Sequence, residues 1–595
     1  MSKVGSLAIS ALRAGYRSGG LNPVEVVEAV YERIAAHADD AVWIHLVPRE
    51  EAVARARALS DPNLPLYGIP FAVKDNIDAA GIPTTAACPA FAYTPGRNAE
   101  TVERLLAAGA ILIGKTNLDQ FATGLVGVRS PYGVPRNAIH PDYVPGGSSS
   151  GSAVAVAAGL VSFSLGTDTA GSGRVPAAFN NIVGLKPTRG YFSTRGVVPA
   201  CRTLDCVSVF ALTCDDAGAV GAILTGFDAE DAFSRREASP VAMAIESAKG
   251  FRFGVPDRAS LEFFGDTETP ALFEQAVRDL KELGGTEVSI DFTPLRETAA
   301  LLYQGPWVAE RMAALKPFMA EHAADMHPVT RAIVEGANRF SATDAFEATY
   351  RLAELRRQVE PMWVGVDVVL LPTAGTCFTL AQLAAEPVAR NTDLGYYTNF
   401  LNLLDMCATA VPSGFCTNGV PFGVTLAAPA GRDGFVLGIA GRLHRIRPVP
   451  MGATGIPVPV SRAVDGEVAV AVVGAHLRGL PLNRELLEGG AVFLRQCRTA
   501  PIYKFYELPG AVPRKPGLIR QTEGGTAIEV EVWRMPAAQF GAFVARIPAP
   551  LGIGTLVLET GESVKGFLAE PAACEGARDI SEFGGWRQYL AGGSK

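Results

Sequence analysis

Apolar and polar residues follow one another along the first part of the chain in patterns typical of helices that lead into buried strands. Asn22-Pro23 precedes apolar residues at helical spacing, so we expect Asn22 to cap a helix whose first turn holds Pro23. Further along, residues 103–109 favour a helix, and the apolar run 110–113 favours a buried strand that stops at Gly114.

The same order of helix and strand returns near the middle of the chain. Residues 345–360 are rich in Glu and Arg with helical periodicity, and an apolar strand, 366–371, follows them and stops at Pro372. Repeated units of this kind are typical of α/β proteins, in which helices cover a central sheet. We therefore predict an α/β fold for this part of the chain.

The pattern changes in the last quarter of the chain. Residues 445–463 contain four prolines and few helix formers, which favours an extended connector. Beyond it the period falls to two, as in residues 528–532, and residues 555–560 and 564–568 favour a hairpin. A small β-rich domain is predicted there. The predicted boundaries are 1–445 for the first domain, 446–466 for a linker and 467–595 for the second domain.

Composition and charge narrow the class of function. Of the 595 residues, 48% are hydrophobic and 19% charged, which excludes a disordered chain. The formal net charge of -7, without a dense basic tract, argues against nucleic acid or anionic lipid as a partner. No apolar run is long enough for a membrane helix, and the first residues do not form a secretory signal. We expect a cytoplasmic protein with a small-molecule substrate.

The cysteines and histidines give no sign of a metal site or a disulfide framework. The nine cysteines contain no Cys-x-x-Cys pair, and among the seven histidines only His322 and His327 form a close pair. Both observations argue against zinc, and reduced, mostly buried thiols are expected. We therefore predict neither a metal nor an organic cofactor.

The most informative stretch is a segment of Ser and Gly, residues 145–152, which leads into a largely apolar run, 153–166. A flexible linker has the same composition, but a linker does not precede an apolar segment that must be buried. A phosphate-binding loop is a second interpretation, because Gly-rich turns expose backbone N–H groups, yet no Gly-Lys-Ser/Thr sequence follows. Neither interpretation fits the segment well.

Four segments together resemble the amidase signature family. The segments are 68–76, which contains a lysine, Gly-Lys-Thr-Asn at 114–117, the Ser-Gly segment, and Gly-Thr-Asp-x-x-Gly-Ser at 166–172 with Arg174 and Pro176 after it. The resemblance covers roughly residues 1–445 and implies a central mixed β-sheet flanked by helices. It also implies a Ser-cisSer-Lys triad, with Lys74 as the base, Ser148 as the cis-peptide serine and Ser172 as the nucleophile. The spacing that the family keeps between its two serines selects Ser148 over its neighbours.

The chemistry accounts for these residue types. A serine hydroxyl is a weak nucleophile until a base takes its proton, and an exposed lysine, with a pKa of about 10.4, cannot be that base at neutral pH. Lys74 must therefore be buried, and the apolar residues before it suit such burial. Asp168 and Arg174 are expected to pair and hold their loop in shape. The expected oxyanion hole consists of the backbone N–H groups of Thr169, Ala170, Gly171 and Ser172.

Residues 302–311 resemble a segment of allophanate hydrolases, in which a Tyr and an Arg hold the carboxylate of the substrate. The matching positions are Tyr303 and Arg311. An Arg fork suits a planar carboxylate, and a phenol adds one hydrogen bond. Because Gly305-Pro306 interrupts the helix, the sequence does not show that the two side chains share a face, and a surface Arg beside a core Tyr is the alternative.

A second segment points to the same enzymes. Residues 117–124 end in Asp-Gln-Phe-Ala-Thr-Gly, a form that looks specific to allophanate hydrolases, whereas many amidases carry Glu in place of Gln120. The resemblance adds Gly124 to the expected substrate-binding residues. Ser149, next to the cis-peptide serine, is added as an auxiliary hydrogen-bonding serine.

The second domain resembles the C-terminal domain of allophanate hydrolases, whose fold is similar to the γ-glutamylcyclotransferases. The match begins at residues 474–483 and places His476 at the position of a histidine of that family. It implies that the first domain releases ammonia and leaves N-carboxycarbamate, which the second domain decarboxylates. That step needs a proton at nitrogen, and His titrates near neutral pH. A structural or surface histidine is the alternative for His476.

Three classes of function stay open. The first is a hydrolase of allophanate in urea and nitrogen metabolism, or in the breakdown of biuret or cyanuric acid, and the family implies a homodimer. The second is a general amidase or a glutamyl-tRNA amidotransferase-like subunit, whose last domain would be a binding module. The third is a non-catalytic scaffold of the same fold, against which the intact Lys, Ser and Ser set argues.

Overall fold

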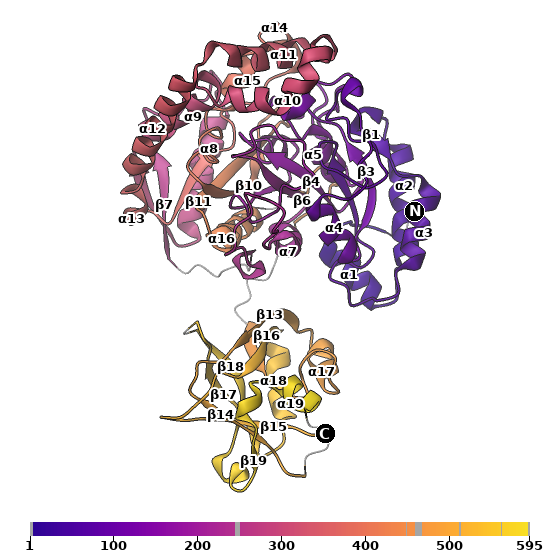
Figure 1. Ribbon diagram of the computed structural model, residues 1–595, viewed down its shortest axis with the longest axis vertical. Helices are drawn as coiled ribbons and strands as arrows, with labels where there is room; N and C mark the ends of the chain where they lie inside the picture. Colours follow the sequence, from indigo (N-terminus) through magenta and orange to yellow (C-terminus); the bar gives the residue numbers. More distant parts are fainter. Residues whose placement is uncertain are drawn as a thin grey trace. The chain divides into compact units, whose positions relative to one another are not determined.

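The structure is a computed structural model, and it describes residues 4–243, 250–447, 449–458, 467–510, 513–560 and 562–592 of the chain. The chain divides into two compact units, Met1–Pro459 and Val460–Lys595 (Figure 1). Each unit has its own sheets and its own core of buried apolar side chains. Within the described ranges, no helix has the length and apolar character needed to cross a lipid bilayer.

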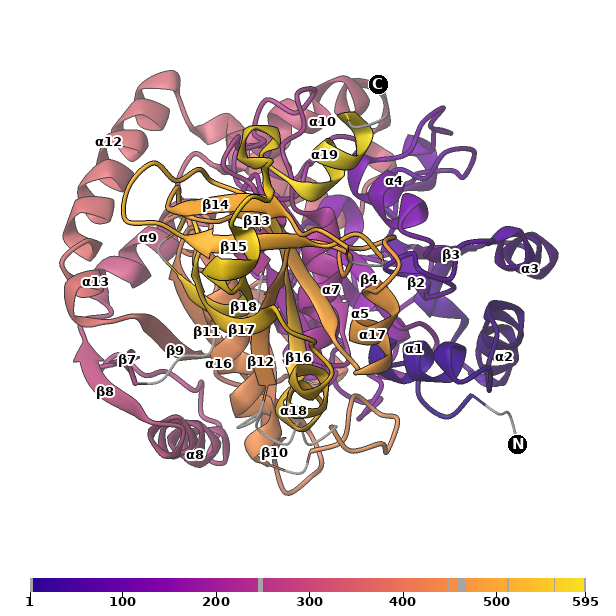
Figure 2. The same ribbon diagram turned by 90° about the horizontal axis from the view of Figure 1, so that it is seen from below.

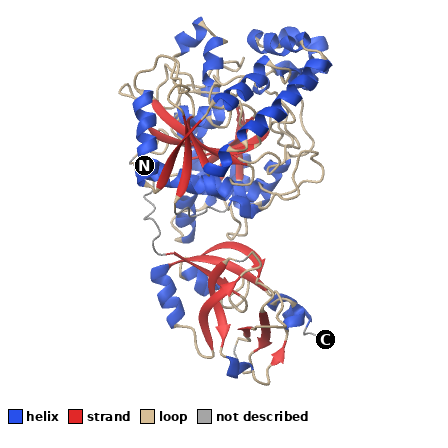
Figure 3. Ribbon diagram, turned by 90° about the vertical axis from the view of Figure 1, so that its left-hand side faces the viewer, coloured by secondary structure: helices blue, strands red, loops and turns tan. Residues whose placement is uncertain are grey.

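A large mixed sheet runs through the first unit (Figure 3). Its strands are β1 (Trp43–Leu46), β2 (Pro70–Lys74), β3 (Ile111–Thr116), β4 (Phe163–Asp168), β5 (Val183–Lys186), β6 (Cys206–Ala211), β7 (Phe251–Pro256), β8 (Gly285–Ile290), β9 (Val368–Pro372), β10 (Met406–Phe415) and β11 (Pro421–Pro429). Their order across the sheet is β1-β3-β2-β4-β6-β5-β10-β11-β9-β7-β8. β2 is parallel to both of its neighbours, β3 and β4, so the carboxyl ends of these three strands meet at one edge.

Helices flank this sheet (Figures 1 and 2). They are α1 (Ile9–Arg17), α2 (Pro23–Ala36), α3 (Arg49–Ala58), α4 (Glu100–Ala107), α5 (Ser150–Ala157), α6 (Val175–Phe179), α7 (Cys214–Leu224), α8 (Thr269–Glu282), α9 (Thr293–Gln304), α10 (Val308–His322), α11 (Pro328–Glu335), α12 (Ala342–Val359), α13 (Met362–Gly365), α14 (Leu380–Ala385), α15 (Ala389–Leu394) and α16 (Asp433–Ile446). Every residue of α5 is buried, because this helix packs against β2, β3, β4 and β6.

Several predicted elements of the first unit are confirmed. Asn22 caps α2, with Pro23 in the first turn and reciprocal hydrogen bonds to Glu25. The predicted helices 103–109 and 345–360 are α4 and α12, and the strand 366–371 is β9. β3 runs two residues beyond the expected stop at Gly114, because parallel pairing with β2 continues through Thr116.

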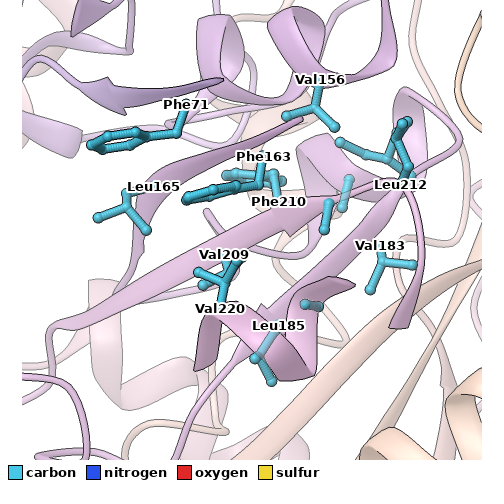
Figure 4. Packing of buried hydrophobic residues seen from close by; sticks show 14 of the residues in the cluster. Phe71, Val156, Phe163, Leu165, Val183, Leu185, Val209, Phe210, Leu212 and Val220 are labelled. Atoms are coloured by element: carbon cyan, nitrogen blue, oxygen red, sulfur yellow. The ribbon is translucent and has the colours of Figure 1, made fainter. Parts of the chain in front are cut away.

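The core of the first unit fixes the strands that end at the site. Phe71 of β2 and Phe163 of β4 are register partners, and their rings stack with centroids 5.4 Å apart (Figure 4). All five residues of β2 and all six of β4 are buried. Strands buried on both faces read as continuous apolar runs, which is why the pattern before Lys74 predicted burial.

The second unit is small and rich in β-structure. Its strands are β12 (Glu467–Val472), β13 (Val492–Arg498), β14 (Tyr503–Glu507), β15 (Pro516–Arg520), β16 (Glu529–Pro536), β17 (Leu551–Val557), β18 (Ser563–Ala569) and β19 (Arg578–Asp579), and its helices are α17 (Asn483–Glu488), α18 (Ala537–Ala545) and α19 (Trp586–Gly592). One sheet has the order β13-β16-β12-β18-β17 and the other β15-β14-β19. Residues 529–532 of the predicted strand 528–532 lie in β16, and the predicted hairpin is β17–β18. The expected α/β fold with a β-rich second domain is confirmed.

Part of the segment predicted as a linker, 446–466, packs onto the first unit. Val449 and Val458 are buried in the first core, and Pro450 forms an isolated β-bridge with Pro457. Asn181 donates a hydrogen bond from Nδ2 to the carbonyl of Pro450 at 2.7 Å. The prolines of this stretch therefore shape a packed turn and not only a connector, while 459–466 lie outside the described residues.

Candidate active site

Lys74 ends β2 and is fully buried. Its Nζ donates to Ser148 Oγ at 2.8 Å and to Thr167 Oγ1 at 2.7 Å. Thr167 belongs to β4, the parallel neighbour of β2, so the sheet itself brings the amine and this hydroxyl together. The structure thus places two of the three expected triad residues, Lys74 and Ser148, in direct contact.

The pKa of the Lys74 amine is lowered to about 7, chiefly because burial disfavours its charged form. The negative charges of Asp119, Asp205 and Asp168 oppose this shift, and the positive charge of Arg311 adds to it. A large share of the amine is therefore neutral near pH 7, where it can accept a proton.

Ser148 follows a cis peptide bond, Gly147–Ser148. The carbonyl of Ser148 accepts a hydrogen bond from the N–H of Asp119 at 2.9 Å. The Asp119 carboxylate accepts the N–H groups of Val126, Gly127 and Arg129 at 2.9–3.2 Å. Asp119 therefore connects the Ser-Gly segment to the loop that contains residues 126–129.

Ser149 is buried and its hydroxyl is bonded to the backbone of Thr167. Ser149 Oγ donates to the Thr167 carbonyl at 3.2 Å and accepts the Thr167 N–H at 3.3 Å. Ser149 therefore contacts Thr167, a residue that itself contacts Lys74, and its expected role toward the substrate stays a prediction.

Ser172 lies in the turn between β4 and α6. Its Oγ donates a long hydrogen bond, 3.5 Å, to the carbonyl of Gly124. Asp168 shapes the turn: its carboxylate accepts the N–H of Gly171 at 2.8 Å and of Gly173 at 3.1 Å, and Arg174 at 2.8 and 3.0 Å. Burial alone would raise the pKa of Asp168, but Arg174 holds it below its usual range. Asp168 and Arg174 thus form the expected loop-holding pair.

The structure shows which of the four N–H groups expected to form an oxyanion hole already have an acceptor. The N–H groups of Thr169, Ala170 and Ser172 have no acceptor within the described ranges, whereas the N–H of Gly171 is already donated to Asp168. Gly171 has φ +130°, and a Cβ at this position would lie 2.5 Å from Thr398 Oγ1. The turn therefore needs glycine for its shape, and the neighbouring amides are the ones free to bind an oxyanion.

Tyr303 and Arg311 are brought together by the break between α9 and α10. Arg311 Nη2 donates to Tyr303 Oη at 3.1 Å, and Nη1 donates to Thr123 Oγ1 at 2.9 Å. Arg311 is only 2% exposed, and no carboxylate of the described chain lies within ion-pair distance of it. Burial would lower the pKa of Arg311, but Tyr303 and nearby acids raise it overall, so the side chain stays charged.

Gly124 and its neighbour Thr123 connect Arg311 to Ser172. Thr123, its neighbour, accepts Arg311, and the carbonyl of Gly124 accepts Ser172. Gly124 has φ +155°, and a Cβ there would lie 2.6 Å from Asp119 Oδ2. The guanidinium and the serine hydroxyl are therefore linked through two consecutive residues, a separation suited to a small molecule.

Three residues of this site were not singled out from the sequence. They are Thr167, Asp119 and Thr123, which contact Lys74, Ser148 and Arg311 respectively. All three lie inside segments that carry the family resemblance, so the motifs contained them. Their roles depend on contacts between segments, which the motifs do not reveal.

His476 lies in the second unit, four residues after β12 ends. Its Nε2 is 3.2 Å from Glu485 Oε2, and its ring stacks on Phe567 with centroids 5.1 Å apart. The rings of His476 and Phe543 form a T-shaped pair, with centroids 5.4 Å apart. Burial lowers the pKa of His476, and Glu485 partly opposes that shift. Nδ1 of His476 has no partner within the described ranges.

Two family models match the chain. Residues 25–437 match the Amidase family, and residues 468–591 match the allophanate hydrolase C-terminal domain family. The structure is similar to that of Kluyveromyces lactis allophanate hydrolase, with 42% identity, a TM-score of 0.74, and coverage of 99% of this chain and 100% of that one.

The chain covers very different shares of two curated relatives. Urea amidolyase of Saccharomyces cerevisiae is 43% identical over 93% of this chain, which spans 31% of that protein. A glutamyl-tRNA(Gln) amidotransferase subunit of Symbiobacterium thermophilum is 35% identical over 74% of this chain and 96% of that protein. The chain is an amidohydrolase that belongs to the amidase family, and its second unit belongs to the allophanate hydrolase C-terminal domain family.

Proposed function

We propose that the first unit hydrolyses allophanate, a urea that carries a carboxylate on one nitrogen. The observation behind this proposal is the buried guanidinium of Arg311, which has no carboxylate of the described chain at ion-pair distance and which two consecutive residues link to Ser172. A buried cation is costly unless an anion in direct contact pairs with it. A carboxylate held by Arg311 and Tyr303 would leave the other end of a small urea derivative at Ser172.

Acylation begins with proton transfer along Ser172, Ser148 and Lys74. The neutral amine takes the Ser148 proton as Ser148 takes that of Ser172, and Ser172 Oγ bonds to the terminal carbonyl carbon. The free backbone N–H groups beside Ser172 stabilise the negative charge on the carbonyl oxygen. The C–N bond then breaks, the departing nitrogen receives the proton through Ser148, and ammonia leaves an acyl group on Ser172.

Deacylation and the second reaction complete the sequence. Water attacks the acyl carbon, its proton passes along the same groups, and N-carboxycarbamate leaves. In the second unit, His476 delivers a proton to the central nitrogen as one C–N bond breaks. The nitrogen keeps the electron pair of that bond, so the products are carbon dioxide and carbamate, and carbamate breaks down to ammonia and carbon dioxide.

A substrate series tests the first reaction. Biuret has an amide where allophanate has its carboxylate, so it is a matched neutral substrate. We expect kcat/KM for allophanate to exceed that for biuret by about 100-fold, because charge-assisted hydrogen bonds to Arg311 contribute about 2–3 kcal/mol. Ammonia release from allophanate, biuret, urea and malonamide measures this. Equal turnover of allophanate and biuret would overturn the proposed substrate.

The second reaction has its own test. In the full-length His476→Ala variant, ammonia release by the first unit should continue while N-carboxycarbamate accumulates, because its nitrogen lacks a proton donor. Carbon-13 NMR of labelled allophanate follows both species. Loss of the intermediate at the wild-type rate would exclude the role of His476.

A second candidate function has one observation in its favour. The chain is 35% identical, over 74% of its length, to one of the subunits of a glutamyl-tRNA(Gln) amidotransferase. The same triad would serve a general amidase or such an amidotransferase, and the second unit would then be a binding module. Hydrolysis of glutamine faster than of allophanate would favour this candidate.

A further inference from the structure

Gln120 connects the loop 119–124 to the chain that follows helix α10. Its side chain is only 1% exposed. Oε1 accepts a hydrogen bond from the N–H of His327 at 2.7 Å, and Nε2 donates to the carbonyl of Ala87 at 3.1 Å. These partners fix the orientation of the amide, because the first can only donate and the second can only accept. The side chain at position 120 therefore supplies an acceptor and a donor at once.

The loop 119–124 contacts the chain at both ends of α10. In the first turn of this helix, Arg311 donates from Nη1 to Thr123 Oγ1 at 2.9 Å. Beyond the last turn, His327 directly precedes α11 and donates its N–H to Gln120. One short loop therefore holds the helix that carries the guanidinium by hydrogen bonds at its beginning and after its end.

A small apolar cluster packs the middle of α10 against the same loop. Leu315 and Phe318 lie on α10, and the cluster joins them to Phe121 of the loop. The rings of Phe121 and Phe318 have centroids 5.6 Å apart. Apolar packing has no preferred direction, whereas a hydrogen bond weakens steeply when its donor and acceptor move out of line. The cluster therefore holds α10 onto the loop, and the hydrogen bonds fix where along the loop it lies.

The backbone on both sides of the Gln120 amide lies in the left-handed region. Phe121 and Ala122 have φ values of 52° and 53°, and Ala86 and Ala87 have 50° and 58°. The N–H of Phe121 donates to the carbonyl of Ala86 at 2.9 Å, so the two turns are bonded to each other. Residues other than glycine keep such conformations only where surrounding contacts enforce them. The bond from Gln120 to Ala87 is one of these contacts.

We propose that Gln120 is a positioning residue for the carboxylate of the substrate; the inference rests on the proposed function. Its amide fixes α10 and so places the guanidinium of Arg311 at the distance from Ser172 that a small urea derivative needs. Charge-assisted hydrogen bonds from Arg311 to a carboxylate depend on direction, so a shift of α10 weakens them. Lys74 and Ser148 contact each other without Gln120, so the proton transfer depends on it less.

The test is Gln120→Met in the full-length protein, which removes both hydrogen bonds of the amide and adds no charge. KM for allophanate should rise about tenfold and kcat should change less than about threefold. KM for biuret, which has no carboxylate, should stay within about twofold of the wild type. The matched control is Gln275→Met in α8, whose amide also donates, to Asp279 at 2.7 Å, and accepts, from Arg278 at 2.6 Å. This control should keep the wild-type KM for both substrates.

A double-mutant cycle shows whether Gln120 acts through Arg311. In the Arg311→Met background, Gln120→Met should raise KM for allophanate by less than about twofold, because the contact that it positions is already absent. If Gln120→Met does not fold, Gln120→Glu takes its place, since it keeps an acceptor for His327 and loses the donor for Ala87. Its charge would repel the substrate in both backgrounds, so the cycle separates that repulsion from an effect through Arg311.

The outcomes separate this inference from the function on which it rests. If Arg311→Met leaves KM for allophanate unchanged, the proposed carboxylate site fails and the inference fails with it. If Arg311→Met raises KM but Gln120→Met only lowers the free energy of unfolding, Gln120 is structural and the inference fails alone. An equal rise of KM for biuret, or a further tenfold rise in the Arg311→Met background, would show a general effect on the site and also overturn the inference.

Discussion

Two neighbouring strands of the first unit carry lysines at their carboxyl ends in closely similar settings but with different partners. Lys74 of β2 and Lys115 of β3 are both fully buried, and burial lowers the pKa of each. Lys74 contacts two hydroxyls, whereas Lys115 forms an ion pair with Asp75 at 3.1 Å and donates to Thr84 Oγ1 at 2.6 Å.

The difference teaches that burial alone does not make a lysine a base. A hydroxyl can give a proton as well as accept a hydrogen bond, so a neutral Lys74 beside Ser148 can move a proton. A carboxylate at ion-pair distance favours the charged amine, so Asp75 opposes the effect of burial on the pKa of Lys115. The two sites therefore predict opposite effects for the same substitution.

The largest expected effect is that of Lys74→Met on catalysis. Methionine has similar length but cannot accept a proton, so kcat/KM for allophanate should fall by about 10³-fold or more. The free energy of unfolding should change by only about 1–2 kcal/mol, because no charged group loses its partner. Ammonia assays and chemical denaturation measure both quantities, and near-normal turnover would contradict the assigned base.

Lys115→Met should instead act on stability. It leaves the buried carboxylate of Asp75 without its ion-pair partner, which costs about 3–5 kcal/mol of unfolding free energy. Protein that remains folded should keep its kcat. Denaturation of Lys115→Met and of the double variant with Asp75→Asn provides the comparison, since the second change removes the stranded charge and should recover stability. A larger loss of kcat than of stability would break the contrast with Lys74.

Arg311 sharpens the comparison, because it is also a buried cation. It has no carboxylate of the described chain at ion-pair distance, and we assign it no role as a base. In Arg311→Met, KM for allophanate should rise about 100-fold, by the loss of about 2–3 kcal/mol of charge-assisted hydrogen bonding, while kcat changes less. The neutral substrate biuret is the internal control, and its KM should stay nearly constant. An unchanged KM for allophanate would remove the carboxylate role of Arg311.

The sequence could predict a large part of this site because its residues lie in short local motifs. Lys74, Ser148 and Ser172 each stand in a segment that resembles the family, and the helix–strand periodicity anticipated α2, α4, α12 and β9. The contact between Tyr303 and Arg311 could not be predicted, because the helix is interrupted between α9 and α10. The two side chains meet only in the folded structure.

The other contacts of the site depend on the pairing of strands that are far apart in the sequence. No local pattern indicates that β4 lies beside β2, and this pairing is what places Thr167 against Lys74. The apolar residues before Lys74 suited a buried amine, but equally apolar residues precede Lys115. The two lysines differ in their contact with Asp75. This residue directly follows Lys74 in the sequence, but its carboxylate forms an ion pair with Lys115 and not with the proposed base. A local sequence pattern reports burial and not the partner.

The smallest effect is a pH dependence that Lys74 should show. Its pKa of about 7 means that the amine becomes protonated below that pH and can no longer accept the serine proton. We expect kcat/KM for allophanate to fall about tenfold for each pH unit below about 7 and to level off above it. A profile without an inflection near neutral pH would contradict a neutral Lys74.

The titration of Lys74 should also change the unfolding free energy with pH, and proton binding fixes the direction of this change. In the unfolded chain an amine keeps its proton up to a pKa of about 10.4, whereas folded Lys74 releases it near pH 7. Between these values the unfolded chain binds more protons, so the unfolding free energy rises with pH through this group. The stability difference between wild type and Lys74→Met isolates Lys74, because other titrations cancel. The unfolding free energy of the wild type should increase relative to that of the variant as the pH rises above 7. A difference that does not change with pH would show that the pKa of folded Lys74 is not lowered.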